Sequence, residues 1–289
     1  MKRMIGMAAV CIILLAGMNG IKSLCRNVSL RGVEGWWKEE GGKKADIGNE
    51  AVDTALVKPQ IYTDAEVAQK LMELSETSED YKTIYENMAA YPAEMLAALC
   101  SNEEMLDFVL NYPQRTESAQ GGFTAEEKAA AIPLLMQWDR RWGYVPYGNS
   151  CVGLSGCAPT CLSMVVLALT ANEEATPDAL AGYAWQEGYY TEGTGTSWSF
   201  LTEGAAHWGV AGQEIGLDRA KVMAELEAGH PIICSMRPGD FTTAGHFIVL
   251  TGVEDGKIRV NDPNSNARSS RLWDYETLEG QIKNLWSYQ

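Results

Sequence analysis

Positive charge and histidine are both scarce in this 289-residue sequence. It has 23 lysines and arginines against 38 aspartates and glutamates, a formal charge of −15, and only three histidines. Nucleic-acid binding needs clustered basic residues that neutralise phosphates, so this balance argues against a nucleic-acid partner. The sequence also lacks the C-x2-C and H-E-x-x-H spacings and the glycine-rich signatures of nucleotide and flavin sites. We therefore expect no metal and no cofactor.

An uninterrupted apolar run occurs at the N-terminus, where Lys2 and Arg3 precede residues 4–17. A basic start followed by a short apolar run is typical of an export signal. The run is shorter than the roughly 20 residues that a membrane span needs. We expect residues 1–25 to be a signal peptide or an N-terminal membrane anchor. Any contact of the chain with a membrane would be through this segment alone. The chain would then be extracytoplasmic, either secreted or anchored at the cell surface. The alternative is a buried N-terminal helix.

The seven cysteines are too few and too irregularly spaced for a disulfide scaffold. Six of them follow the apolar run: Cys25, Cys100, Cys151, Cys157, Cys161 and Cys234. Export would place them in an oxidising compartment. If Cys157 stays free for chemistry, at least one more thiol is unpaired in a monomer. The pairing of the others and the oligomeric state stay open.

The chain divides into segments of different composition. Residues 26–62 contain glycine and scattered charges, which predicts a linker. Residues 63–122 have helical periodicity, with capping boxes at Thr63–Glu66 and Ser101–Glu104, and predict a small all-helical lobe. This helical lobe either packs on the main domain or serves as a recognition module. Residues 123–289 are expected to form the main domain.

The main domain mixes helical and strand patterns. Helical patterns occur at about 157–169, 177–187, 199–207 and 218–228. Strand-like apolar runs come later, at 231–235, 246–253 and 257–261. Helices first and antiparallel strands afterwards predict an α+β fold.

The segment from Leu154 to Leu169 predicts a tight turn that leads into a buried helix. Gly156 permits conformations that other residues resist, and Pro159 suits a first helical turn. Apolar residues then recur at helical spacing with almost no polar interruption, so we expect burial nearly all round. Cys157 would lie among unpaired N–H donors at the positive end of the helix dipole, which favours a thiolate. This is the setting that a nucleophilic cysteine requires.

A nucleophilic cysteine needs a base, and the three histidines differ in their settings. His207 ends a helical pattern and His230 precedes a strand, so structural roles are expected for both. His246 begins an apolar strand that faces a second strand, which ends at Asp262. An aspartate beside this histidine would orient the imidazole and stabilise its cation. The segment around Asp262 is alternatively a simple strand-ending turn.

The length of the hairpin loop decides whether His246 and Asp262 meet. With the three-residue loop Glu254–Gly256, opposed residue numbers sum to 510, and the two side chains are diagonal neighbours on one face. With a two-residue loop of Asp255 and Gly256, they lie on opposite faces. The sequence permits the first arrangement without forcing it.

Four sequence blocks carry a resemblance to a known family: Met136–Trp142, Gly156–Thr160, Gly245–Gly252 and Val260–Pro263. Together and in this order they resemble the papain-like cysteine peptidases related to the double-glycine-leader (bacteriocin-processing) peptidases of bacteria. The similarity is to the free-standing, exported branch and spans roughly residues 130–289. Ala158 departs from the glycine that relatives often have. The sequence contains no ATP-binding motif, so leader cleavage coupled to export is not implied.

The resemblance implies a papain-like fold, with Cys157 on a helical part and His246 and Asp262 on an antiparallel sheet. Cys157 would be the nucleophile and His246 the general base. Asp262 would orient the histidine, and Gln137 would donate to the oxyanion, unless Gln137 is merely a polar surface residue. The implied activity is hydrolysis of peptide (amide) bonds in a peptide or protein substrate.

Two other functions stay open. A cysteine acyltransferase or a cell-wall amidase would use the same triad, and only the acceptor would differ. A surface-tethered binding protein would keep the fold with a disused active site. The glycine-containing loops at 193–198 and 237–243 are candidate walls of a substrate cleft, and neither predicts a pocket for a particular side chain.

Overall fold

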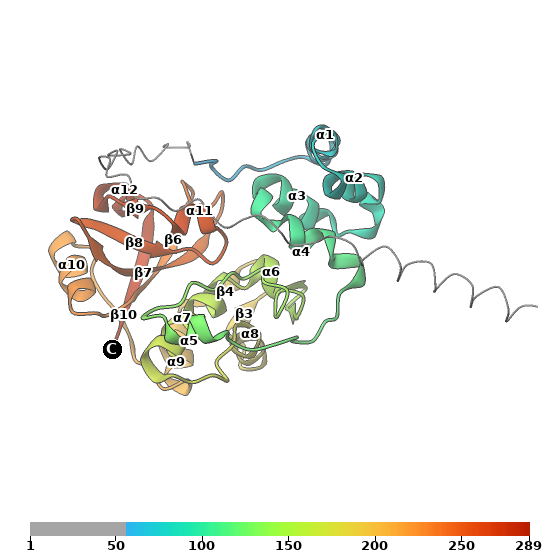
Figure 1. The fold of residues 1–289 in the computed structure, drawn as a ribbon. Helices are drawn as coiled ribbons and strands as arrows, with labels where there is room; N and C mark the ends of the chain where they lie inside the picture. The colour runs from blue at the N-terminus through green and yellow to red at the C-terminus, as the bar shows by residue number, and fades with distance from the viewer. Residues whose placement is uncertain (1–55) are drawn as a thin grey trace, which may run out of the picture. The chain divides into compact units, whose positions relative to one another are not determined.

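The described part of the chain is residues 56–289 of a computed structural model, drawn in Figure 1 from blue to red. The expected export signal at 1–25, Cys25 and most of the expected linker lie outside the described residues. Within residues 56–289, no helix combines the length and the apolar character needed to cross a bilayer. All of the described residues belong to one compact unit.

Short helices open the described part of the chain. They are α1 (Asp64–Ser75), α2 (Glu79–Glu86), η1 (Met88–Ala90), α3 (Ala93–Ser101), η2 (Glu103–Met105), α4 (Leu106–Leu110) and η3 (Tyr112–Gln114), where η denotes a 3-10 helix. The capping box predicted at Thr63 is confirmed, because Thr63 and Glu66 each accept the other's N–H. The box predicted at Ser101 is wrong. Asn102, an equally good N-cap, accepts the Glu104 N–H instead and begins η2.

The rest of the chain has helices first and most of its strands afterwards, which confirms the predicted α+β class. The helices are α5 (Ala125–Ala129), α6 (Val152–Ser155), α7 (Cys157–Thr170), α8 (Pro177–Gln186), η4 (Trp198–Leu201), α9 (Glu203–His207), α10 (Arg219–Glu227), α11 (Asn266–Ser269) and α12 (Tyr275–Glu279). The strands are β1 (Pro146–Tyr147), β2 (Ser150–Cys151), β3 (Tyr190–Thr191), β4 (Gly195–Thr196), β5 (Gly212–Glu214), β6 (Ile232–Met236), β7 (His246–Glu254), β8 (Lys257–Asn261), β9 (Leu272–Trp273) and β10 (Ile282–Tyr288). The single helix expected over 199–207 is wrong, since Thr202, with a φ of −119°, separates η4 from α9.

An antiparallel sheet of six strands in the order β5-β10-β6-β7-β8-β9 dominates the C-terminal part (Figure 1, orange to red). The predicted strands are confirmed as β6, β7 and β8. The sequence does not predict β10, because Lys283 and Asn284 interrupt its apolar alternation.

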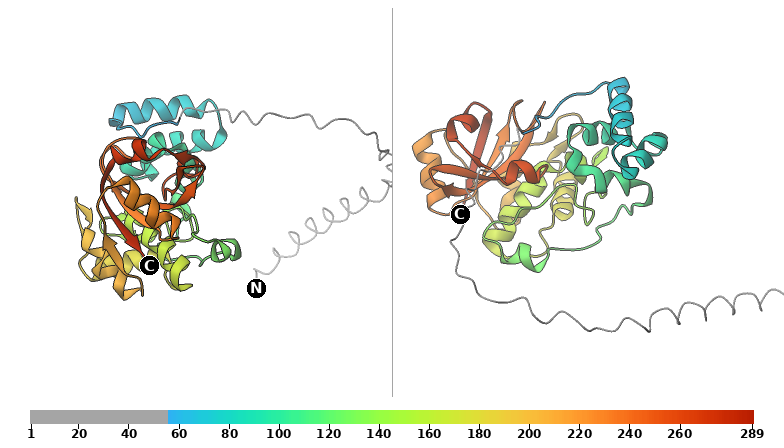
Figure 2. Two further views of the ribbon diagram at one scale, coloured as in Figure 1. Left: turned by 90° about the vertical axis from the view of Figure 1, so that its left-hand side faces the viewer. Right: turned by 45° about the horizontal axis from the view of Figure 1, so that its top comes forward.

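The sheet is covered on both faces, which explains why β6 is buried along its whole length. Ile233 of β6 belongs to the hydrophobic cluster around α7. Its neighbours Ile232 and Cys234 point to the opposite face, where they join Val222 and Leu226 of α10. The orange helix in the left view of Figure 2 is this α10. The period of two along β6 therefore divides its side chains between two cores.

The turn of the β7–β8 hairpin is the two-residue alternative. Glu254 pairs with Lys257, and between them Asp255 and Gly256 have positive φ values of 51° and 75°. Two consecutive positive φ angles are typical of a type I′ turn, which an Asp-Gly pair favours. By itself, this turn would put the histidine and the aspartate on opposite faces of the hairpin.

A β-bulge in β7 shifts the pairing by one residue, to the register that a three-residue loop would give. The pairing shifts between Leu250 and Gly252, so that Thr251 is one residue in excess on β7. Beyond the bulge Leu250 pairs with Val260, as the three-residue loop would have required. The histidine and the aspartate at the far end of the hairpin are thereby brought to the same face.

Helix α7 is buried nearly all round, as predicted: every residue from Ala158 to Leu167 is buried. Gly156, which precedes it, has an ordinary φ of −88°, so the expectation of a special conformation there is wrong. A glycine is needed for another reason. A Cβ at this position would lie 2.5 Å from the carbonyl oxygen of Val152. Only glycine lets α6 run this closely into α7.

The helical lobe packs directly on the main domain. Phe108 of α4 stacks on Tyr144, with ring centroids 4.6 Å apart, and its carbonyl accepts the Tyr144 hydroxyl at 2.6 Å. Gly143 and Gly153 make room for Phe108, since a Cβ at either would lie within 2.8 Å of its ring. These contacts favour a lobe that packs on the main domain over a separate recognition module.

Candidate active site

Cys157 is the first residue of α7, and its side chain is half-buried. The first N–H groups of a helix have no acceptor within the helix, and the dipole makes this end positive. The thiol lines two adjoining cavities with volumes of about 370 and 1080 Å³. It is therefore reachable from solvent at the positive end of a buried helix.

The other four described cysteines are poor nucleophiles by comparison. All five described cysteines are free thiols. Burial raises the pKa of Cys100 and of Cys151 to about 11. It also raises the pKa of Cys161 and of Cys234 well above the ordinary value. Since the thiolate is the reactive form, these four thiols are protected from chemistry at neutral pH.

His246 is the first residue of β7 and is 8% exposed. Its Nε2 lies 2.7 Å from Oδ1 of Asp262, which leaves Nδ1 for Cys157. Burial acts to lower the pKa of His246. The charge and hydrogen bond of Asp262, helped by those of Cys157, more than offset it and raise this pKa to about 9. An imidazole with this pKa can take a proton from a thiol and keep it at neutral pH.

Asp262 directly follows β8 and is completely buried. Its Oδ2 accepts Nε of Arg268 at 2.5 Å, and its Oδ1 also accepts the Asn264 N–H at 2.8 Å. Burial acts to raise the pKa of Asp262, but His246 and Arg268 hold it below its ordinary value. The segment is also a turn, since the Asp262 carbonyl accepts the Ser265 N–H at 3.1 Å. The segment therefore forms a turn and also brings its carboxylate into contact with His246.

Gln137 is 4% exposed, so the alternative of a surface residue is wrong. Its Nε2 donates to the Gly153 carbonyl at 2.9 Å, and its backbone N–H donates to the Pro263 carbonyl at 2.8 Å. An amide nitrogen carries two hydrogens, so a second donor remains beside the bond to Gly153. Gln137 lines the smaller cavity together with Cys157. This position suits a donor to an oxygen bound next to the thiol.

The two cavities share the thiol and the imidazole and have different walls. Residues 193–198 and Arg237 line the larger one, and residues 241–243 line the smaller one. Both loops predicted as cleft walls therefore border a cavity beside the thiol. The smaller cavity is also lined by α3 and by residues 59–62, so the helical lobe supplies one of its walls.

The other two histidines have structural contacts. His207 stacks on Tyr183, with ring centroids 4.2 Å apart, and His230 binds the Glu225 carboxylate at 2.8 Å. Neither lines either of the two cavities. In the part of the chain that the structure describes, no group of three or more His, Cys, Asp or Glu side chains is arranged to hold a metal ion.

Sequence patterns do not reveal Arg268, the second partner of the Asp262 carboxylate. It is 4% exposed and lies on the four-residue helix α11, which is too short for a periodic signal. The only cue is a basic residue six positions after the aspartate, and no spacing rule connects the two.

The sequence model of the Peptidase_C39 like family matches residues 130–289, more than half of the chain. The chain belongs to this family. It is a cysteine peptidase with a papain-like fold that acts on a peptide or protein, and the family resemblance seen in the sequence is confirmed.

Two solved structures are similar to parts of this C39-like peptidase. The peptidase domain of Streptococcus ComA, a bifunctional ABC transporter involved in a quorum-sensing pathway, is 18% identical with a TM-score of 0.38, covering 46% of this chain and 89% of that one. A Bacillus anthracis protein described as a C39-like peptidase is 15% identical with a TM-score of 0.38, covering 55% and 94%. No curated protein matches the sequence.

Proposed function

We propose that this peptidase hydrolyses peptide bonds with Cys157 as nucleophile, His246 as general base and Asp262 as the residue that orients it. One observation supports the proposal most. A buried carboxylate holds Nε2 of His246, and the other ring nitrogen is left for a thiol at a helix N-terminus. A nucleophile, a base and a group that orients the base are the three parts that this chemistry needs.

The reaction would begin with transfer of the Cys157 proton to Nδ1 of His246. The thiolate then attacks the carbonyl carbon of the substrate, forming a C–S bond and an oxyanion. Collapse of this intermediate breaks the C–N bond, and the imidazolium gives its proton to the leaving amine. A water molecule, deprotonated by the same imidazole, attacks the thioester and releases a carboxylic acid and the free thiol. One peptide bond and one water are consumed.

Two donors are available for the oxyanion. One is the backbone N–H of Cys157 in the first turn of α7, and the other is the second amide hydrogen of Gln137. Both would bind most strongly when the carbonyl oxygen becomes negative, so they would stabilise the transition state more than the substrate. Asp262, held as a carboxylate, would balance the charge of the imidazolium.

We also propose that the peptidase acts outside the cytoplasm. The basic residues Lys2 and Arg3 and the apolar run that follows them support this location. Fractionation of bacterial cells that express the full chain with a C-terminal tag tests it. Tagged protein in the medium or the membrane fraction is expected, and tagged protein confined to the cytoplasm would contradict the location.

Hydrolysis is tested with a mixture of quenched fluorescent peptides and mass spectrometry of the products. The wild-type chain and Cys161→Ala should cleave the same peptides, and Cys157→Ala should cleave none. Added amines test the acyltransferase alternative: new amide products in place of acids would favour a transferase. Equal cleavage by wild type and Cys157→Ala would overturn the proposal.

A further inference from the structure

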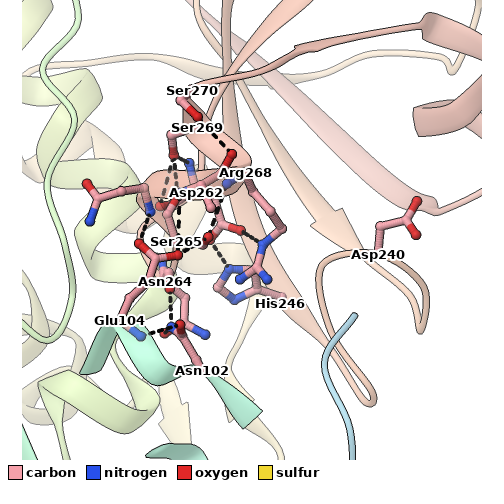
Figure 3. Close-up of polar contacts among 12 residues, drawn as sticks. Asn102, Glu104, Asp240, His246, Asp262, Asn264, Ser265, Arg268, Ser269 and Ser270 are labelled. Carbon is pink, nitrogen blue, oxygen red and sulfur yellow. Dashed lines mark hydrogen bonds and ion pairs between the residues drawn. The ribbon is translucent and has the colours of Figure 1, made fainter. Parts of the chain in front are cut away.

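The segment that follows Asp262 is bound by the helical lobe (Figure 3). Glu104 of η2 accepts the Ser265 hydroxyl at 2.5 Å and the Asn266 N–H at 2.7 Å. These groups begin α11, so a carboxylate 161 residues away in the sequence caps this helix. A helix of four residues has too few internal hydrogen bonds to be stable by itself. The cap from the lobe therefore fixes where α11 lies.

Asn102 makes a second contact from the lobe. Its Nδ2 donates to the Asn264 carbonyl at 2.5 Å, and its Oδ1 accepts the Glu104 N–H at 3.2 Å, so the two lobe residues hold each other. The indole of Trp138 also donates to the Asn264 carbonyl, at 3.3 Å. The Asn264 N–H in turn donates to the Asp262 carboxylate. The backbone next to the carboxylate is thus anchored from the lobe side.

Arg268 completes the connection between the lobe and the carboxylate. The Ser265 hydroxyl donates to Glu104 and accepts the Arg268 N–H at 3.1 Å, while Nε of Arg268 donates to Asp262. Asp262 and Arg268 are both almost completely buried. A buried ion pair is stable only while its partners stay close, so a displacement of α11 would disturb the carboxylate directly.

We propose that Glu104, together with Asn102, is a positioning residue for catalysis: through α11, the helical lobe holds Asp262 against His246. The inference rests on the proposed function, since the position of Asp262 matters only if His246 is the base. The helical lobe would then contribute to catalysis by keeping Asp262 in position. Glu104 is the diagnostic residue, because Asn102 also lines the smaller cavity and Glu104 does not.

The charged groups around the imidazole make a specific readout possible. Cys157 of α7 and Asp262 after β8 face His246, and Arg268 of α11 faces Asp262. Glu104 is bonded to none of these side chains. If α11 loosens, Asp262 moves away and the strongest influence that favours the imidazolium weakens. The pH profile should then change although Glu104 does not touch the histidine.

The test compares Glu104→Ala and Glu104→Gln with Glu103→Ala, in the full chain. Glu103 lies on the same turn, is half-exposed and binds Lys70 within the lobe, so it is a matched control. Two profiles are measured: the rate of Cys157 alkylation by iodoacetamide from pH 5 to 10, and kcat and KM on a cleaved peptide. Glu104→Gln keeps one acceptor oxygen, whereas Glu104→Ala keeps none.

The alkaline limb of the alkylation profile is the pH range in which His246 loses its proton, and Glu104→Ala should move it below pH 9. The same substitution should reduce kcat about 10- to 100-fold, with little change in KM. Glu104→Gln should be intermediate, and Glu103→Ala should match wild type. An unchanged profile and kcat in Glu104→Ala would overturn the proposal. Equal defects in Glu104→Ala and Glu104→Gln would also overturn it, because they would indicate that the charge of Glu104 matters and not its hydrogen bonds to α11. A wild-type Cys157 with no activated thiolate would instead refute the proposed function itself.

A second inference rests on a different observation, the positive charge beside the thiol. Most lysines and arginines of the described residues form salt bridges with carboxylates: Lys58, Lys70, Lys82, Arg115, Lys128, Arg140, Arg141, Arg219, Lys257, Arg259 and Arg268. Within residues 56–289, Arg237 and Lys283 form none. Both line the larger cavity beside Cys157.

These two cations are placed to bind an acidic group of a ligand in the larger cavity rather than a carboxylate of the protein. Arg237 follows β6 and Lys283 lies on the paired strand β10, with its ammonium 5.3 Å from the centre of the Trp198 ring. Among the described residues, Glu94 is the one carboxylate that lines the larger cavity, and it also lines the smaller one, so it lies where the two meet. Arg237 and Lys283 line only the larger one. The remainder of the larger cavity is therefore cationic in a chain with a formal charge of −15.

We infer that Arg237 and Lys283 select an acidic residue of the peptide substrate on one side of the scissile bond. This inference deepens the proposed function and rests on it. Peptides that carry Glu, Gln or Lys at each position around the cleaved bond provide the test, with wild type, Arg237→Glu/Lys283→Glu and the control Lys221→Glu. Lys221 also lacks a salt bridge among the described residues but lines neither cavity.

Wild type and Lys221→Glu should prefer Glu over Gln at one position by about five-fold in kcat/KM per cation, and salt should weaken the preference. Arg237→Glu/Lys283→Glu should reverse it in favour of Lys. Cleavage that is indifferent to charge at every position would overturn this inference and leave the proposed function intact. No cleavage of any peptide by wild type would refute the proposed function.

Discussion

Asp262→Asn is the most informative single substitution, because it removes a negative charge that lies between two cations. The Asp262 carboxylate binds Nε2 of His246 through one oxygen and Nε of Arg268 through the other. Asparagine keeps the size of the side chain and an acceptor oxygen. The substitution therefore separates the effect of charge from the effect of shape.

The stability effect follows from Arg268, which is 4% exposed and loses the only ionised partner that it has among residues 56–289. Removing one member of a buried ion pair typically costs ~3–5 kcal/mol, because an uncompensated charge stays buried. Asp262→Asn should lower the free energy of unfolding by about this amount at pH 7. Arg268→Met added to Asp262→Asn should recover most of it, since the unpaired charge is then gone.

The catalytic effect follows from His246, whose pKa of about 9 is raised chiefly by Asp262 against the effect of burial. Each pKa unit corresponds to ~1.36 kcal/mol, so the rise from 6.5 represents roughly 3 kcal/mol of preference for the imidazolium. Without the carboxylate, burial should bring the pKa of His246 below 6.5. The imidazolium would then be largely lost at neutral pH.

Two assays check these effects. Urea denaturation followed by tryptophan fluorescence gives the free energies of unfolding of wild type, Asp262→Asn and Asp262→Asn/Arg268→Met. Alkylation of Cys157 from pH 5 to 10 gives the position of the alkaline limb. The double variant should regain stability yet keep the altered pH profile. A stable Asp262→Asn, or a limb that stays near pH 9 in either variant, would refute the reasoning.

Three further predictions concern single residues. Gln137→Ala should reduce kcat by roughly 100- to 1,000-fold while alkylation of the cysteine stays near the wild-type rate, and equal kcat values would exclude an oxyanion role. Phe108→Ala should cost ~3–5 kcal/mol in urea denaturation, because this ring fills the junction between lobe and main domain, and a loss below 1 kcal/mol would contradict that packing. The folded-state pKa of His246 is raised, so its contribution to stability should be complete below pH 6.5 and lost as pH rises through about 9. Wild type compared with His246→Gln by urea denaturation between pH 6 and 10 measures this loss, and a difference that grows with pH would contradict it.

The candidate site could be predicted from the sequence where its signals are local. The helix that begins at Cys157 and the strand that begins at His246 both follow from apolar periodicity and turn residues. The register that joins His246 to Asp262 could not be decided, because the hairpin combines a two-residue turn with a bulge at Thr251. The two-residue loop accounts for the pairing next to the turn, and the three-residue loop accounts for the pairing beyond the bulge. Since a bulge depends on packing on both faces of the sheet, no local sequence pattern predicts it.

The contacts behind Asp262 could not be predicted at all. Glu104 and Ser265 are 161 residues apart, and neither lies in a periodic segment that would pair them. The sequence predicts a different role for Glu104, as the last residue of a capping box that does not form. Arg268 has no signal beyond its charge. Tertiary contacts between irregular segments decide this part of the site.

The most direct test of the central claim is the chemical state of the cysteines in the full chain. An irreversible thiol-directed peptidyl inhibitor is incubated with wild type, Cys157→Ala, Cys161→Ala and His246→Ala across pH 5 to 9, and the labelled sites are identified by mass spectrometry. The account predicts rapid labelling of Cys157 alone in wild type and Cys161→Ala, persisting below the reference thiol pKa of about 8.5 and weakened in His246→Ala. Slow labelling spread over several cysteines, rising only near that reference value, would contradict it and favour a binding protein with a disused active site.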